Sequence, residues 1–223
     1  MSTDNYIPEQ MDDFFNKRVD EYEAHMKRLD NSDDFYRMVP SGISSTDEIV
    51  EILDLGTGTG LEIQGIFEKA PNAQISCIDI AAGMLDELGK KYSAYFQQLN
   101  IIVGSYLELP LPENKFDYVV AVQTMHHWLP DIKVQLYRKI RNSLKSGGLY
   151  IEADYIVDEQ EEKERLDRYA KIQKSGVLKE GEMYHIDIPF SVKTQKRLYK
   201  KAGFSITDIV YEKSNGAVFV SRK

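Results

Sequence analysis

The stretch EILDLGTGTG, residues 51–60, is an apolar run that ends in an acid and then breaks into three glycines spaced by single residues. Residues 49–55 have the composition of a buried strand, and the glycines mark the turn after it. Because glycine has no Cβ atom, Gly56, Gly58 and Gly60 can adopt left-handed backbone angles and let a ligand lie against the peptide groups. The stretch therefore predicts a ligand site at the end of a strand.

Strands and helices alternate along the chain after this turn. The next expected strands are QISCIDI, NIIVGS, FDYVVAVQ and LYIEADYIV, and the expected helices between them cover residues 61–70, 82–97 and 131–144. Apolar residues spaced by three and four indicate the helices, and continuous apolar runs indicate the strands. Repeated units of this kind form a parallel sheet that is covered by helices on both faces.

The two ends of the chain differ from this pattern. Apolar spacing over residues 9–29 predicts one amphipathic helix within an N-terminal helical segment, residues 1–46, and residues 40–46 read as a loop. Residues 158–190 are charged and then irregular, which suggests a lid-like insertion. A helix over residues 192–202 precedes two alternating runs, and the Asn-Gly step between these runs is a strong hairpin signal.

These elements predict one domain over residues 1–223. Its fold class is α/β, a doubly wound, mostly parallel seven-stranded sheet with a C-terminal antiparallel hairpin and helices on both faces.

Composition narrows the possible partners. The chain has 223 residues, 42% of them hydrophobic and 29% charged, and no window resembles the ~20 apolar residues of a membrane span. The net charge of −8 opposes binding to nucleic acid. The start of the chain has acids and no basic region before an apolar stretch, so we expect a cytoplasmic protein rather than a secreted one. Cys77, the only cysteine, reads as a buried strand thiol and excludes an internal disulfide.

Two nucleotide-binding motifs fit the glycine turn poorly. A P-loop needs a lysine soon after the last glycine, but Gly60 is followed by Leu61, Glu62 and Ile63. A dinucleotide fingerprint needs a third glycine where this chain has Leu61 or Ile63, depending on the glycine from which the count starts. An acid in the first turn of the helix, Glu62, also competes with a pyrophosphate for the helix N-terminus.

Asp79 ends the second strand, 19 residues after Gly60. A carboxylate in this place accepts hydrogen bonds from ribose hydroxyls in folds of this class. The alternative is that Asp79 caps the helix that begins near Ala81. We expect a ligand with a ribose and with a cationic or zwitterionic end.

In these elements the chain resembles the class I S-adenosylmethionine-dependent methyltransferases, particularly those that act on small molecules. The matching elements, in the order of the family, are EILDLGTGTG, CIDIAAGML, IIVGSYLELPL, FDYVVAVQTMHHW, LKSGGLYIEADY and LYKKAGF. The resemblance covers most of the chain. It implies a Rossmann-like fold, S-adenosylmethionine as cofactor, and methyl transfer to an oxygen or nitrogen of a small-molecule acceptor.

The resemblance also assigns cofactor contacts. Asp54 would lie near the amino group of the methionine moiety, Asp79 would hold the ribose, and the family often has an acid where this chain has Ser105. The complete set of implied contacts is Tyr22, Asp54, Gly56, Gly58, Gly60, Asp79, Ile80, Met84, Ser105, Tyr106 and Gln123.

Three histidines are candidates for contact with the methyl acceptor. His126 and His127 follow the fourth strand directly, and an imidazole pKa near 6.5 suits proton removal at neutral pH. The alternative is that one of them packs beside Trp128. His185 and Asp187 alternate with isoleucines, so an extended segment would turn both toward one side, either to the acceptor or to solvent.

We expect no metal ion. Glu152, Asp154 and His185 could be combined into a site, but no histidine pair has the H-x-x-x-H spacing of a metal-binding helix. Two other functions remain open from the sequence, a nicotinamide-dependent oxidoreductase and a non-catalytic module that binds S-adenosylmethionine. The sequence does not indicate the oligomeric state.

Overall fold

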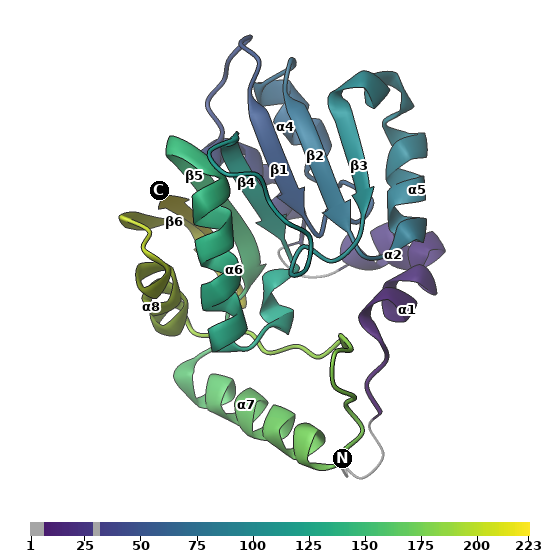
Figure 1. Cartoon of the computed structure of the whole chain (residues 1–223), viewed down its shortest axis with the longest axis vertical. Helices are drawn as coiled ribbons and strands as arrows, with labels where there is room; N and C mark the ends of the chain where they lie inside the picture. Colours follow the sequence, from purple (N-terminus) through teal and green to yellow (C-terminus); the bar gives the residue numbers. More distant parts are fainter. Residues whose placement is uncertain (1–6, 29–31) are drawn as a thin grey trace.

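A seven-stranded sheet forms the centre of the computed structural model, which describes residues 7–28 and 32–223 (Figure 1). The strand order is β3-β2-β1-β4-β5-β7-β6. The strands are β1 (Glu51–Leu55), β2 (Gln74–Asp79), β3 (Leu99–Val103), β4 (Phe116–Val122), β5 (Leu144–Tyr155), β6 (Ile206–Lys213) and β7 (Gly216–Arg222). Strands β1 to β5 are parallel, and β7 pairs antiparallel with both β5 and β6. The predicted fold class is confirmed.

Helices cover the sheet on both faces. They are α1 (Met11–Asn16), α2 (Val19–Met26), α3 (Ser32–Met38), η1 (Val39–Gly42), α4 (Ile63–Lys69), α5 (Ala82–Lys91), η2 (Ser93–Gln98), η3 (Met125–His127), α6 (Pro130–Ser143), α7 (Glu159–Lys174) and α8 (Val192–Ala202). One core cluster joins α6 and α8 to the sheet, and a second joins α3, α4 and α5 to it. Within the described ranges, no helix combines the length and apolar character needed to cross a membrane.

Strand β4 shows why the central runs are apolar throughout. Val119 and Ala121 belong to the core cluster on one face, whereas Val120 and Val122 belong to the cluster on the other. Side chains of a strand alternate between faces, so a strand buried on both sides needs apolar residues at every position.

The strand order reverses beside β1, because β2 lies on one side of it and β4 on the other. In open sheets of this kind, ligands bind beyond the carboxyl ends of the strands at this reversal. The parallel strands in Figure 1 point downward, toward α1, η3 and α7. The glycine turn after β1 therefore lies at the edge where a ligand is expected.

The N-terminal helix differs from the prediction. Instead of one helix over residues 9–29 there are two, α1 and α2, and Leu29 lies outside the described residues. Arg18 leaves the helical conformation, with φ −114° and ψ 7°, and its guanidinium donates to the Phe14 carbonyl at 2.8 Å and to Glu9 at 2.8 Å. These bonds give the Phe14 carbonyl, near the end of α1, a hydrogen-bond partner. The helix therefore ends here, although the apolar spacing in the sequence continues beyond it. Part of the expected loop at residues 40–46 is also the helical turn η1.

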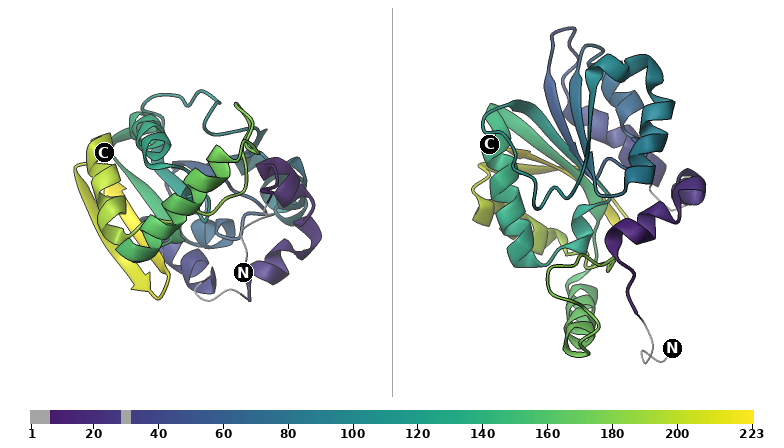
Figure 2. Two further views of the ribbon diagram at one scale, coloured as in Figure 1. Left: turned by 90° about the horizontal axis from the view of Figure 1, so that it is seen from below. Right: turned by 45° about the vertical axis from the view of Figure 1, so that its right-hand side comes forward.

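Residues 158–190 lie over the carboxyl edge of the sheet. In the view from below in Figure 2, α7 crosses this end of the molecule. The segment after α7 is tied to the N-terminal arm, because Met11 N donates to the Met183 carbonyl at 2.8 Å and Gln10 forms a bridge with Tyr184. Two parts of the chain that are distant in sequence therefore meet above the glycine turn.

Candidate functional site

All three glycines of the turn have left-handed backbone angles, with φ of +68° at Gly56, +55° at Gly58 and +68° at Gly60. A Cβ atom on Gly56 would overlap the side chain of Thr124, and one on Gly60 would meet apolar side chains at 2.9 Å and 3.0 Å. A Cβ on Gly58 would meet only the Tyr22 ring, at 3.8 Å. Gly56 and Gly60 are thus required for packing, whereas Gly58 keeps its backbone open to the space above the turn.

Asp79 connects this turn to the helix that follows β2. One carboxylate oxygen accepts from Gly58 N at 2.8 Å, and the other accepts from Ala81 N at 2.8 Å. Burial raises the pKa of Asp79, while these backbone donors act in the opposite direction. The two interpretations of Asp79 are therefore compatible: it supports the start of α5 and also lines the cavity above the turn.

Asp54, at the end of β1, is fully buried beside Glu62. Neither carboxylate oxygen of Asp54 has a hydrogen-bond partner among the described residues. Burial and then the neighbouring Glu62 raise the pKa of Asp54 well above its usual value. Buried polar groups normally have partners, so this pair of acids indicates a place for a ligand that carries positive charge.

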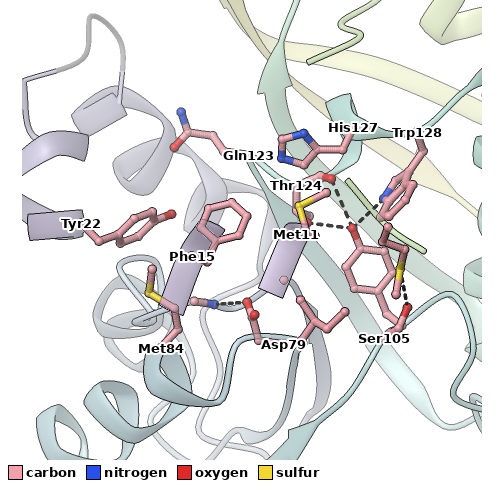
Figure 3. Close-up of a pocket in the computed structure, with 15 residues that line it drawn as sticks. Met11, Phe15, Tyr22, Asp79, Met84, Ser105, Gln123, Thr124, His127 and Trp128 are labelled. Atoms are coloured by element: carbon pink, nitrogen blue, oxygen red, sulfur yellow. Dashed lines mark hydrogen bonds between the residues drawn. The ribbon is translucent and has the colours of Figure 1, made fainter. Parts of the chain in front are cut away.

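A cavity lies above the turn (Figure 3), and we call it the glycine-turn cavity. Its walls are Met11, Phe15, Tyr22, Gly56, Gly58, Asp79, Ile80, Met84, Ser105, Tyr106, Gln123, Thr124, His127, Trp128 and Met183. Most of the residues expected to contact the cofactor are in this set. Asp54 and Gly60 are not, because Asp54 lies in β1 and Gly60 packs against neighbouring helices.

One wall of the glycine-turn cavity is a chain of side-chain hydrogen bonds. The Tyr106 hydroxyl lies 2.8 Å from Thr124 Oγ1 and accepts from Trp128 Nε1 at 2.7 Å (Figure 3). Ser105 Oγ donates to Met183 Sδ at 3.5 Å. Sequence reasoning missed Thr124 and Met183. Thr124 lies in the quoted family element and was open to detection, whereas no local pattern indicates that Met183 returns to this edge.

Gln123, just after β4, has a strained backbone. Its φ of +51° is uncommon for a residue other than glycine. The side chain is fixed by two tyrosines, since Oε1 accepts from the Tyr36 hydroxyl at 2.9 Å and Nε2 donates to the Tyr155 hydroxyl at 2.9 Å. Such strain is found at functional sites, where the surrounding structure imposes it.

A second cavity adjoins the first and shares Phe15, Tyr22, Gln123 and His127 with it. We call it the histidine cavity, because its other walls include His126, Tyr155, His185 and Asp187. Of the three candidate histidines, His127 alone lines both cavities, and it therefore stands between them.

Asp187 brings the three histidines together. Its Oδ1 atom lies 3.5 Å from His126 Nε2, 3.4 Å from His127 Nδ1 and 3.8 Å from His185 Nε2. The other ring nitrogen of His126 lies 2.6 Å from Asp154 Oδ1. The expected alternation of His185 and Asp187 toward one side is thus observed, and Asp187 remains 43% exposed at its side chain.

The electrostatic environment gives the three histidines different pKa values. Burial opposes charge on His126, but Asp154 and then Asp187 outweigh it and raise the pKa of His126 to about 9. Burial and the neighbouring His126 lower the pKa of His127, and burial with His127 lowers the pKa of His185 to about 4. At neutral pH, His126 is cationic while His127 and His185 are neutral.

The acids considered for a metal site from the sequence are not together. Asp154 pairs with His126, whereas Glu152 accepts from Tyr137 at 2.7 Å and lies 3.4 Å from Lys133 on the α6 side of the sheet. Glu152 and Asp154, which the sequence does not favour as metal ligands together with His185, therefore have separate partners.

Residues 52–148 match the family described as "Methyltransferase domain". A carboxy-S-adenosyl-L-methionine synthase of Nautilia profundicola is 25% identical over 230 residues, which cover 99% of this chain and 93% of that protein. A malonyl-[acyl-carrier protein] O-methyltransferase 2 of Ilyobacter polytropus is 32% identical over 113 residues, 49% of this chain and 40% of that protein.

Solved structures share the fold. Human N-acetylserotonin methyltransferase in complex with SAM has a TM-score of 0.66 at 19% identity, with 94% of this chain and 56% of that chain covered. The DhpI-SAH complex has a TM-score of 0.70 at 15% identity, with 94% and 93% covered. At these identities the likeness concerns the fold.

Proposed function

Since this chain belongs to the class I S-adenosylmethionine-dependent methyltransferases, we propose that it transfers the methyl group of S-adenosylmethionine to an oxygen or nitrogen of a small-molecule acceptor. The observation that supports this most is the buried Asp54 without hydrogen-bond partners, beside a turn where Gly58 leaves its backbone open. A zwitterionic ligand with a ribose matches these features.

Each part of the cofactor has candidate partners. Asp54, which is buried below the cavity wall and not part of it, would attract the ammonium group through its charge. Asp79 would accept from the ribose hydroxyls, because a carboxylate has about four acceptor positions and its two backbone donors occupy only some of them. Ile80 and Met84 offer apolar contacts for the adenine. When bound, S-adenosylmethionine supplies an electrophilic methyl group on a cationic sulfur.

The histidine cavity would hold the acceptor, with His127 as general base. We assign the proton of neutral His127 to Nδ1, which lies 3.4 Å from both Asp187 Oδ1 and the Ile186 carbonyl. The lone pair on Nε2 then remains to take the proton that an acceptor hydroxyl or ammonium loses. Residues 158–190 would close this cavity as a lid and exclude water.

A second candidate reaction is suggested by the relatives named carboxy-S-adenosyl-L-methionine synthases, one of which aligns with 99% of this chain. Modification of the cofactor itself would leave it carrying a carboxylate. Two cations line the histidine cavity and could attract such a charge, but Asp154 and Asp187 already balance His126, and Glu9 pairs with Arg18. The geometry therefore favours a separate methyl acceptor.

Calorimetry and mass spectrometry test the proposal together. The protein is expected to bind S-adenosylmethionine and its demethylated product, but not nicotinamide dinucleotides. Incubation with panels of phenols, amines and carboxylates should then give one methylated acceptor. A carboxylated cofactor would support the second reaction, tight nicotinamide binding would contradict the family's cofactor, and binding without any product would favour a non-catalytic module.

Cofactor affinity is expected to rise as the pH increases through the raised pKa of the Asp54–Glu62 pair. Burial raises the pKa of Asp54 and of Glu62, so the ligand-free pair keeps a proton to a higher pH than two exposed acids would. An ammonium group favours the ionised pair, and binding should therefore release a proton, measurable by calorimetry in two buffers. Asp54→Asn should weaken binding and remove most of this dependence, whereas equal pH profiles for both proteins would contradict the assignment.

His185→Ala is expected to leave cofactor affinity nearly unchanged and to lower turnover severalfold. His185 lines the histidine cavity but not the glycine-turn cavity, and its ring stacks on Phe14 with centroids 3.5 Å apart. Removing the ring would loosen the acceptor without affecting the cofactor. Steady-state kinetics with the identified acceptor checks this, and a matching loss of cofactor affinity would show that the ring supports both cavities.

A further inference from the structure

We propose that His126, His127 and Asp187 form a binding site for one divalent transition-metal ion, with Zn²⁺ or Fe²⁺ as the fitting ions. One ligand atom from each of the three residues lies within 4.8 Å of the others. His126 Nε2, His127 Nδ1 and Asp187 Oδ1 would serve as ligands, and His126, which is cationic without the ion, would release its Nε2 proton to water when the ion binds. The site lies in the histidine cavity and is separate from the glycine turn. Metal binding does not depend on methyl transfer, so the inference goes beyond the proposed function.

Two of the three ligand separations match a metal site, and the third, between the two histidine nitrogens, is within 4.8 Å, so a rotation of one ring would complete the geometry. Tetrahedral Zn²⁺ with bonds of about 2.0 to 2.2 Å holds its ligand atoms about 3.3 to 3.5 Å apart. Asp187 Oδ1 lies 3.5 Å from His126 Nε2 and 3.4 Å from His127 Nδ1. These separations are long for hydrogen bonds between charged groups, but they are the edge length of a coordination tetrahedron.

The contacts that the ligand residues make with their neighbours also fit a metal site. A histidine that binds a metal usually donates its other ring nitrogen to a carboxylate, and His126 Nδ1 lies 2.6 Å from Asp154 Oδ1. Asp154 is 2% exposed, so this contact fixes the ring. The carboxylate ligand is held in place by the backbone, because Ile188 N donates to the His126 carbonyl at 2.7 Å.

Three protein ligands leave at least one coordination position open. Asp187 is 43% exposed at its side chain, so an ion can enter from the histidine cavity. Two imidazoles and one carboxylate suit Zn²⁺ and non-haem Fe²⁺ better than Mg²⁺ or Ca²⁺, which prefer oxygen. An oxygen or nitrogen donor of the acceptor would take the open position.

Metal binding and the base role of His127 exclude each other. Coordination through Nδ1 places the ring proton on Nε2, whereas a general base needs a free lone pair on Nε2. In the metal-loaded protein, coordination to the ion would lower the pKa of an acceptor hydroxyl, and water would take its proton. His127 thus has two tautomers with two different uses, and the metal content of the protein selects between them.

The test uses the full chain without cofactor or acceptor. The protein is treated with a chelator and dialysed, and it is then titrated with Zn²⁺ by calorimetry and with Co²⁺ by visible absorption. We expect one ion per chain and the strong absorption of a four- or five-coordinate Co²⁺ site. Nitrogen-15 NMR of the histidine rings should show His127 protonated at Nε2 only in the Zn²⁺ form.

Matched variants decide whether the ion binds at His126, His127 and Asp187. Asp187→Asn changes a partly exposed ligand, so the fold should persist, and it is expected to weaken Zn²⁺ binding by at least tenfold. Asp154→Asn should weaken it by about 10- to 100-fold without removing a ligand. His25→Ala removes a histidine of α2 that lines the histidine cavity but is not one of the three ligands, and it should leave Zn²⁺ affinity unchanged. Absent binding, or equal affinity in the wild type and Asp187→Asn, would overturn the proposal in favour of an ion-pair cluster.

Discussion

Replacement of His127 by alanine is expected to lower single-turnover methyl transfer by about 10²- to 10⁴-fold at neutral pH, the usual contribution of a general base. His127 borders both cavities, and its Nε2 atom is free to accept a proton when Nδ1 faces Asp187. Burial lowers its pKa, so the neutral form predominates at neutral pH. The reaction should be measured in chelator-treated protein, so that a bound metal does not replace the base.

Three further measurements separate proton acceptance from a structural effect. Cofactor affinity should change little in His127→Ala, because the ring is one wall residue among many. Imidazole in the buffer should restore part of the rate by entering the space that the side chain leaves. The loss should also be smaller for an acceptor that carries no proton. A wild-type rate in His127→Ala would remove the residue from the reaction.

Strong local signals predicted most of the fold. The helix expected over residues 192–202 is observed over Val192–Ala202, where Ser191 caps its start and Gly203 its end. The hairpin expected around Ser214-Asn215-Gly216 is observed, with Ser214 and Asn215 between β6 and β7 and Gly216 as the first residue of β7. The break at Arg18 was missed because tertiary contacts of its guanidinium, with the Phe14 carbonyl and Glu9, override apolar spacing that is continuous in the sequence.

The two sides of the site differ in how far the sequence predicts them. The predicted cofactor contacts Gly58 and Asp79 lie at or just after strand ends, and a parallel sheet brings strand ends together. The acceptor side depends on how the segment after α7 returns to η3. The pairing of His126 with both Asp154 and Asp187 joins three distant parts of the chain, and no spacing in the sequence encodes it.

Asp79→Ala is expected to weaken S-adenosylmethionine binding by about ten- to a hundredfold, equal to roughly 1.5 to 3 kcal/mol. The change removes a charged acceptor for the ribose. It also removes the bond to Gly58 N, which holds the middle of the glycine turn, and the bond to Ala81 N at the start of α5. The ligand-free protein should therefore also unfold at a lower temperature.

Asp79→Asn distinguishes the two effects. The amide keeps one acceptor oxygen, so one of the two backbone bonds survives and the melting temperature should recover part of the loss. The negative charge toward the ribose is absent in both variants, so cofactor affinity should remain low in Asp79→Asn. Calorimetry and thermal unfolding of the two variants, with and without cofactor, provide the comparison. If affinity recovers together with the melting temperature, Asp79 acts by holding the turn and not by binding the ribose.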